Sequence, residues 1–303
     1  MKLLETLKQK VLVSDGAMGT QLMAAGLPSG ACGDLWNITE PEKVIAIQKR
    51  YVDAGSDCLI TNTFGANGLS LARHGHEDKI LDINKAAVKI AREAFGDKPG
   101  FVLGDVGPVG QVLEPFGDLS VDRLRDAVSR QIEGLMEGEP DAIIVETQSD
   151  LAETIVGIEA AKSLGAPCII ASMSYNCGPD GCSFMTMMGV SPEDAAAQLA
   201  EAGADIIAMN CGTGVDMALA KKVIEAYKGH ADKFFMAQPN AGIPTIKDGK
   251  TIYEQTPEKM ADSVLDLLRA GANIVGGCCG STPDHIRAIR AKVDEWNLSL
   301  VSG

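Results

Sequence analysis

The stretch AGADIIAMNCG, residues 202–212, contains the pattern that determines the fold. A glycine ends a helical segment, a short apolar run follows, and a cysteine comes directly after that run. Nearly identical joints occur as AGSD at 54–57 and AGAN at 270–273. Glycine is the residue that most readily closes a helix in the left-handed conformation, so each joint indicates a helix followed by a strand. We interpret these joints as structural parts of a repeated strand–helix plan.

The same plan extends along the whole chain, with eight apolar, β-branched runs that each precede a helical segment. The predicted strands are 11–15, 57–61, 101–105, 141–146, 168–173, 205–209, 234–238 and 272–277. The predicted helices are near 41–54, 78–95, 120–137, 149–164, 192–202, 215–228, 257–270 and 283–295. No Pro-, Ser- or Gly-rich linker divides the chain. This pattern predicts an α/β fold, a (β/α)₈ TIM barrel forming a single domain over residues 1–303, with a doubly wound open sheet as the alternative.

Composition excludes several classes of function. The 303-residue chain is 46% hydrophobic and has 27 basic against 41 acidic residues, which gives a net charge of −14. This charge argues against nucleic acid and against an anionic membrane surface as partners. No apolar run has the length of a membrane span, and the start MKLLETLKQK lacks the features of a secretory signal. We therefore expect a cytoplasmic protein with no nucleic-acid or membrane partner.

Residues able to carry chemistry follow the predicted strands. In a (β/α)₈ barrel the active site is built at the carboxyl ends of the strands, so residues at these positions are expected to share one rim. The long segment 16–40 follows the first strand and is expected on the same face. The residues at the end of a predicted strand or just after it are Asp15, Asn62, Thr63, Asp105, Glu146, Cys211, Asn240, Cys278 and Cys279.

Three of these residues are cysteines, and they predict a metal site. Cys211 follows the sixth strand, whereas Cys278 and Cys279 follow the eighth. Strands two apart in a small barrel have ends close enough to hold one ion, and glycines beside the cysteines allow the adjacent pair to face it together. Three thiolates suit zinc and leave a fourth position open. The competing interpretation, that each cysteine is a small buried apolar residue, explains this shared position less well.

The other five cysteines have no predicted role in chemistry. Cys58 and Cys168 lie at the start of apolar strands, where packing in the core is the expected role. Cys32, Cys177 and Cys182 lie in loops, and we assign them no function. The spacing between the last two would permit a second metal or redox pair, an interpretation that we do not favour.

A site made only of thiolates points to the chemistry of sulfur. Zinc bound by three thiolates carries a net negative charge, which makes it a poor activator of water. Coordination would instead favour loss of the proton from a substrate thiol and keep that sulfur nucleophilic. The expected reaction class is alkylation of a thiol substrate, with Cys211, Cys278 and Cys279 acting through the zinc.

The motifs around these positions resemble those of the homocysteine S-methyltransferase family over almost the whole chain. They are DGAMGTQL, ITNTFGAN, VETQSD, MNCGTG, PNAGIP and GGCCGSTPDHI, in the order of that family. NTFGAN and PNAGIP are most similar to the homocysteine-binding module of cobalamin-dependent methionine synthases. The resemblance implies a barrel that binds Zn²⁺ through the three cysteines and methylates homocysteine to methionine.

The resemblance also implies which residues bind the substrate. Asp15 and Glu146 match carboxylates that receive its ammonium group, and the backbone of the turn 16–19 is expected to bind its carboxylate. Asn240 matches a position whose side-chain oxygen could fill the fourth metal site until substrate displaces it. The substrate-binding residues expected on this basis are Asp15, Gly16, Ala17, Met18, Gly19, Asn62, Glu146 and Asn240.

The methyl donor must come from elsewhere, because the sequence contains no D-x-H-x-x-G pattern for a cobalamin domain. The expected donor is methylcobalamin or another methylcorrinoid, supplied by a separate domain or a corrinoid protein. S-methylmethionine and a betaine-type compound are alternative donors, and a non-catalytic zinc- and thiol-binding module is an alternative function. Methionines 185, 187 and 188 either line a docking surface for such a partner or pack their loop onto the barrel.

Overall fold

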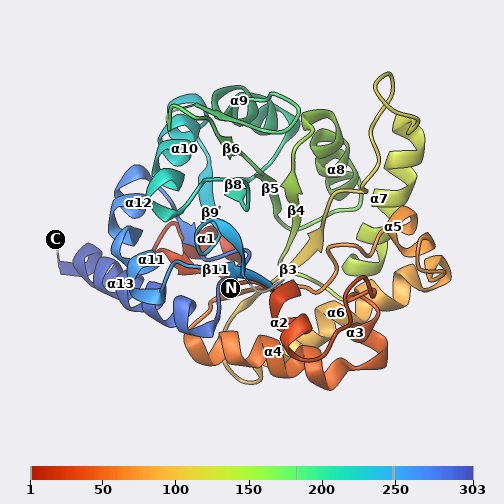
Figure 1. The fold of residues 1–303 in the computed structure, drawn as a ribbon, viewed down its shortest axis with the longest axis horizontal. Helices are drawn as coiled ribbons and strands as arrows, with labels where there is room; N and C mark the ends of the chain where they lie inside the picture. The colour runs from red at the N-terminus through yellow and green to blue at the C-terminus, as the bar shows by residue number, and fades with distance from the viewer. Residues whose placement is uncertain (1, 182, 248–249, 303) are drawn as a thin grey trace.

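The computed structural model describes residues 2–181, 183–247 and 250–302, and its centre is a ring of eight parallel strands (Figure 1). The strands are β1 Leu12–Val13, β2 Cys58–Ile60, β3 Phe101–Val106, β4 Ala142–Gln148, β5 Ile169–Met173, β8 Ile206–Asn210, β9 Phe234–Gln238 and β12 Ile274–Val275. Their order is β1-β12-β9-β8-β5-β4-β3-β2, and a parallel bridge between Ser14 and Cys58 closes the ring. The predicted barrel is confirmed.

Helices surround this ring, as Figure 1 shows. They are α4 Pro41–Ala54, α6 Ile80–Phe95, α7 Val121–Met136, α8 Leu151–Ser163, α9 Pro192–Ala202, α10 Met217–His230, α11 Pro257–Asp262, α12 Val264–Ala270 and α13 Pro283–Ser302. The helix predicted over 257–270 is wrong in one respect, because Ser263 caps both α11 and α12 and separates them. Within the described residues, none of the helices combines the length and apolar character needed to cross a bilayer.

Several short elements were not predicted, since they contain too few residues to show a periodic pattern. They are α1 Leu3–Leu7, α2 Gly19–Ala24, α3 Trp36–Thr39, α5 Gly68–Ala72, the 3₁₀ helix Glu77–Lys79, and the hairpins β6 Asn176–Cys177 with β7 Phe184–Met185 and β10 Pro244–Lys247 with β11 Lys250–Tyr253. The helices α2 and α3 lie within the long segment that follows β1.

The barrel interior is apolar below the site. Leu3 and Leu7 of α1 belong to the same buried cluster as inward-facing strand residues such as Ile144. Cys58 and Cys168 are also in this cluster, at 0% and 2% exposure, and burial raises the pKa of both thiols. Both are therefore neutral core residues, which confirms the predicted packing role.

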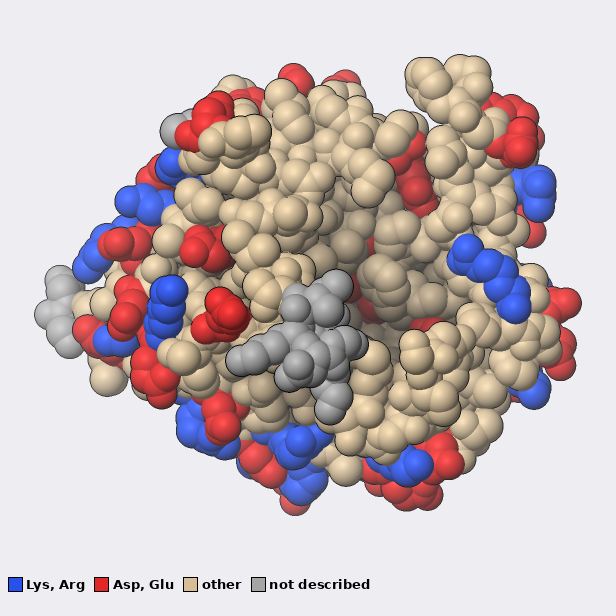
Figure 2. All heavy atoms as spheres, in the orientation of Figure 1, with Lys and Arg blue, Asp and Glu red and all other residues tan. Residues whose placement is uncertain are grey.

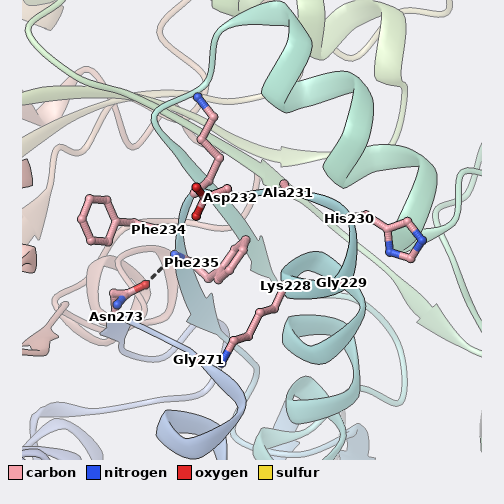
Figure 3. A pocket seen from close by; sticks show the side chains of 10 residues that line it. Lys228, Gly229, His230, Ala231, Asp232, Phe234, Phe235, Gly271 and Asn273 are labelled. Atoms are coloured by element: carbon pink, nitrogen blue, oxygen red, sulfur yellow. Dashed lines mark hydrogen bonds between the residues drawn. The ribbon is translucent and has the colours of Figure 1, made fainter.

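Polar residues at the amino-terminal ends of four strands, three of them in the repeated joints, pair with the neighbouring strand. A polar residue there accepts a hydrogen bond of 2.8–2.9 Å from a backbone N–H of the neighbouring strand. Its own N–H donates at 2.7–2.9 Å to the carbonyl oxygen of the same neighbour. These pairs are Asp57 with Val13, Asp141 with Val102, Asp205 with Ile169 and Asn273 with Phe235, and Figure 3 shows the last of them beside a surface pocket. We call the four polar residues the strand-start residues.

Candidate functional site

Three sulfur atoms gather at the carboxyl ends of the strands. The Sγ atom of Cys279 lies 3.9 Å from that of Cys211 and 4.0 Å from that of Cys278, and all three lie within 4.8 Å of one another. A tetrahedral ion with metal–sulfur bonds of about 2.3 Å separates its sulfur ligands by ~3.8 Å. The sulfur atoms are therefore spaced as the ligands of one zinc ion would be.

The backbone holds these cysteines in place. Cys211 directly follows β8 in the left-handed conformation, with φ of 57°, and Gly212 follows with φ of 85°. A side chain at Gly212 would overlap the carbonyl oxygen of Tyr175, so this position requires glycine. The N–H of Cys278 donates to the carbonyl oxygen of Pro239 at 2.9 Å. The main chain at Cys211 and Cys278 is therefore held in place.

The protonation of the three thiols indicates a need for positive charge. Hydrogen bonds with Cys278 and Cys279 lower the pKa of Cys211 to about 3. Their hydrogen bonds with Cys211 raise the pKa of Cys278, and raise that of Cys279 to about 11. The three groups share protons as one unit, and a second or third thiolate forms only against the repulsion of the first. A divalent cation would supply the charge that three thiolates require.

Asn240 offers a fourth donor atom beside the sulfurs. The residue is 4% exposed, and its Nδ2 donates to the carbonyl oxygen of Gly212 at 3.0 Å. Its Oδ1 is buried and has no hydrogen-bond partner. A hydrogen bond from the Asn240 side chain also contributes to the lowered pKa of Cys211. The Asn240 side chain thus contacts Cys211 through its NH₂ group and also carries an amide oxygen that has no hydrogen-bond partner.

Asp15 lies buried at the end of β1. Its Oδ2 accepts the N–H of Ile60 at 2.9 Å, and its Oδ1 accepts the hydroxyl of Ser14 at 3.2 Å. The residue is only 2% exposed, and this burial raises the pKa of Asp15 from 3.8 to about 7. Ser14 is itself held by a hydrogen bond of 3.2 Å from Nε2 of Gln238.

Two further carboxyl groups lie in the same barrel mouth. Burial, followed by the charges of Asp15 and Cys211, raises the pKa of Glu146 to about 8. Asp105 is 2% exposed, its Oδ1 lacks a partner, and burial followed by the Glu146 charge raises its pKa. Figure 2 shows acidic atoms inside the central hollow, surrounded by a rim that is mostly uncharged. Such a hollow would favour a positively charged group.

The turn 16–19 and Asn62 are already tied into the protein. The N–H of Ala17 donates to Oγ of Ser281 at 3.1 Å, and the carbonyl oxygen of Ala17 accepts the Tyr51 hydroxyl at 2.7 Å. The Nδ2 of Asn62 donates at 2.9 Å to the carbonyl oxygen of Gly33, a residue of the segment 16–40. The structure thus places both features at the mouth, with the Ala17 N–H engaged internally.

Three residues that complete the site were not singled out by sequence. Asn210, the last residue of β8, has its Nδ2 3.7 Å from Sγ of Cys278. Its inward direction could have been predicted, because Ile206 and Ala208 alternate with it toward the interior. Ser281 accepts hydrogen bonds from Ala17 and Tyr51, which are more than 200 residues away in sequence, so no local pattern indicated these contacts.

The remaining predicted positions are on the outer loops. Met185, Met187 and Met188 are 46%, 80% and 45% exposed, so Met187 lies mostly at the surface and the other two are about half covered. Cys32 and Cys177 are half-buried, and Cys182 is outside the described residues.

Comparison with known proteins identifies relatives across the whole barrel. The family model described as homocysteine S-methyltransferase matches residues 12–293. Methionine synthase of Mycobacterium leprae (strain TN) is 34% identical over 314 residues, covering 99% of this chain but 26% of that protein. The Mycobacterium tuberculosis methionine synthase is also 34% identical, covering 96% of this chain and 25% of that protein. The chain thus spans about a quarter of the length of these curated relatives.

Solved structures share the fold. The metallated form of the homocysteine methyltransferase MmuM from Escherichia coli has a TM-score of 0.76 at 23% identity, covering 96% of this chain and 99% of that one. The oxidized form of the same protein has a TM-score of 0.75 at 24% identity, with 96% and 98% coverage. At this level of identity the likeness demonstrates the barrel architecture.

Proposed function

The chain belongs to the homocysteine S-methyltransferase family, a family of methyltransferase enzymes, and from this premise we propose that it methylates the sulfur of homocysteine to give methionine. The observation that carries the proposal is the group of three sulfur atoms within 4.8 Å of one another, beside buried carboxyl groups. A ligand that satisfies both features has a thiol at one end and an ammonium group at the other. Homocysteine has both.

The donor set fits zinc. Cys211, Cys278 and Cys279 would hold Zn²⁺, and the unpaired Oδ1 of Asn240 would be the displaceable fourth donor. The metallated form of the structurally similar MmuM supports a metal in this fold. When bound, zinc supplies positive charge that favours loss of the substrate thiol proton near neutral pH. Asn210 would donate to the Cys278 sulfur, a contact that orients the ligand and moderates its charge.

The carboxyl groups would bind the other end of the substrate. Asp15 and Glu146 would accept the ammonium group, whose charge offsets the burial that raises their pKa values. Backbone N–H groups of Gly16, Met18 and Gly19 would bind the substrate carboxylate, since the Ala17 N–H already donates to Ser281. Asn62 would hold the segment 16–40 against the bound substrate.

The reaction follows from this placement. The thiol proton is lost to solvent, a lone pair of the sulfur forms the new bond to the methyl carbon, and the bond from that carbon to the donor breaks. The bonding electrons remain with the donor. We propose a methylcorrinoid as donor, supplied by a separate domain or protein. The relatives that are 34% identical are methionine synthases, and the matched region covers only about a quarter of their length. The exposed methionines near the mouth would contact this partner.

Methionine formation tests the proposal directly. The zinc-loaded protein is given homocysteine with methylcobalamin, S-methylmethionine or glycine betaine in separate reactions. We expect methionine with methylcobalamin. If methionine forms only with S-methylmethionine or only with glycine betaine, that compound and not a corrinoid would be the methyl donor. Stoichiometric binding of zinc and homocysteine without methionine from any donor would instead identify a non-catalytic binding module.

A further inference from the structure

The backbone beside Glu146 is held in an unfavourable conformation. Thr147 has φ of 56°, in the left-handed region, where a β-branched residue is disfavoured by about 1–2 kcal/mol. The pairing of β4 with β5 is interrupted here, with a register shift between Val145 and Gln148. Glu146 lies inside this irregularity, so the direction of its carboxyl group depends on whatever holds Thr147.

A single buried amide holds Thr147. Asn210 is fully buried, and its Oδ1 accepts the Thr147 N–H at 3.1 Å. Its Nδ2 donates to Oγ1 of the same threonine at 2.7 Å. The Oδ1 also accepts the hydroxyl of Ser172 at 2.7 Å. Because a backbone N–H can only donate, the oxygen must face Thr147 N and the NH₂ group must face Oγ1. The orientation of the amide is therefore determined by its partners.

The same NH₂ group also reaches the metal ligands. Its nitrogen lies 3.7 Å from Sγ of Cys278, within the range of an N–H to sulfur hydrogen bond. An NH₂ group has two hydrogens, so it can donate to Thr147 and to Cys278 at once. One side chain thus connects the residue next to Glu146 with one of the three sulfurs.

We propose that Asn210 is a positioning residue for both halves of the site: it holds Thr147 so that Glu146 faces the substrate ammonium, and it donates to the Cys278 sulfur. The proposal rests on the function proposed above and deepens it. Asn210 would make the protein selective for thiols that carry an α-ammonium group over thiols that lack one. It would do so without touching the substrate.

A purely structural role would give a different result, and the chain contains a matched control. Asn84 is also a fully buried asparagine, and its Nδ2 donates to the carbonyl oxygens of Ala66 at 3.0 Å and Ile80 at 2.8 Å. These contacts involve neither Glu146 nor a cysteine. Truncation of either asparagine should lower stability, but only Asn210 should alter ligand selectivity.

The experiment compares two ligands on the zinc-loaded protein: homocysteine and 4-mercaptobutanoate, which keeps the thiol and carboxylate but lacks the ammonium group. We expect Asn210→Ala to lower the affinity for homocysteine about tenfold or more, and the affinity for 4-mercaptobutanoate about twofold. Zinc affinity, measured by competition with a chelator, should fall roughly tenfold. Thr147→Val removes the Oγ1 acceptor for Asn210 and also the hydrogen bond of this hydroxyl to the Glu146 carboxyl. It should weaken homocysteine binding by about fivefold without changing zinc affinity. Asn84→Ala should leave the ligand ratio and the zinc affinity unchanged.

An unchanged ratio of the two ligand affinities in Asn210→Ala would overturn the proposal, and so would an equal change in Asn84→Ala. If Asn210→Ala does not fold, an unchanged ligand ratio in Thr147→Val would overturn the proposal, because that change removes the Oγ1 contact through which Asn210 holds Thr147. The wild-type comparison separates this proposal from the proposed function. Tight, ammonium-dependent thiol binding without methionine formation would contradict methyl transfer while leaving the role of Asn210 intact.

Discussion

The two ends of the barrel treat their polar groups in opposite ways. At the amino-terminal ends, each strand-start residue pairs with the backbone of a neighbouring strand. At the carboxyl ends, several buried side-chain oxygens have no partner in the protein. They are Asp105 Oδ1, Gln148 Oε1, Gln238 Oε1 and Asn240 Oδ1. The strand-start residues thus use their acceptors within the protein, whereas the mouth retains unpaired acceptors that, in the proposed function, would face a ligand rich in donors or positive charge.

This difference has an energetic consequence. A buried acceptor without a partner costs about 1–3 kcal/mol, so the mouth is less stable than a fully paired end would be. A cation or an ammonium group at the mouth would satisfy these oxygens. Changes at the mouth should therefore reduce binding and activity, whereas changes at the other end should reduce stability alone.

The largest effect is expected at the sulfur cluster. Cys211→Ser, Cys278→Ser and Cys279→Ser should each lower methionine formation at least about 1,000-fold, because loss of one thiolate removes a zinc ligand. Zinc content after purification should fall in parallel, which metal analysis measures.

Cys168→Ser is the matched control, because Cys168 belongs to the apolar cluster inside the barrel and is 2% exposed. It should lower the free energy of unfolding by about 1–3 kcal/mol through burial of a hydroxyl, with zinc content unchanged. Normal turnover in any of the three mouth variants would contradict the assignment of the metal ligands.

The next effect concerns the pH dependence of stability. Burial raises the pKa of Asp15 from 3.8 to about 7, so the folded state keeps a proton that the unfolded state has lost between these values. The free energy of unfolding therefore falls as pH rises from about 4 to 7, by at most about 4 kcal/mol for this group. Asp15→Asn should remove this contribution and be the more stable protein at pH 8. Urea unfolding of the metal-free proteins across this pH range measures it, and parallel curves would contradict the burial argument.

A smaller effect is expected at Glu146. Glu146→Gln removes the charge but keeps the shape, so the affinity for homocysteine should fall about 100-fold while zinc affinity is unchanged. Glu153→Gln is a suitable control, because desolvation raises the pKa of Glu153 as it does that of Glu146, but Glu153 accepts the Val109 N–H instead. Calorimetric titration with homocysteine distinguishes the two. Equal losses in both variants would show that buried charge in general, and not the ammonium contact, controls binding.

The smallest effect is expected at the amino-terminal ends. Asp205→Ala and Asn273→Ala each leave a backbone N–H of the neighbouring strand without its acceptor. We expect each to lower the free energy of unfolding by about 1–2 kcal/mol, with zinc and homocysteine affinities unchanged. Chemical denaturation measures the first quantity. Loss of homocysteine binding without loss of stability would contradict the division between the two ends.

Most of the fold could be predicted because its signals are local and repeated. The joints ending at Asp57, Asp205 and Asn273 identify helix ends and strand starts within a few residues. Even so, β1 and β12 are shorter than predicted, as Leu12–Val13 and Ile274–Val275, although the N–H groups of Gly276 and Gly277 still donate to the carbonyl oxygens of Ala237 and Asp15. The resemblance to the homocysteine S-methyltransferase family is confirmed by the match over residues 12–293.

The site was only partly predictable. Cys211, Cys278 and Cys279 could be brought together by strand order alone, and the structure places their sulfurs side by side. The contact between Asn210 and Thr147 spans 63 residues and depends on the irregular end of β4, which no local pattern reveals. The same limit applies to the contact of Ser281 with Ala17, which joins the two ends of the chain.

Zinc-edge X-ray absorption with and without L-homocysteine tests the central claim most directly. We predict three sulfur ligands and one oxygen or nitrogen ligand in the resting protein, changing to four sulfur ligands when homocysteine is added. An unchanged zinc environment with saturating homocysteine, or fewer than three sulfur ligands at rest, would contradict the account.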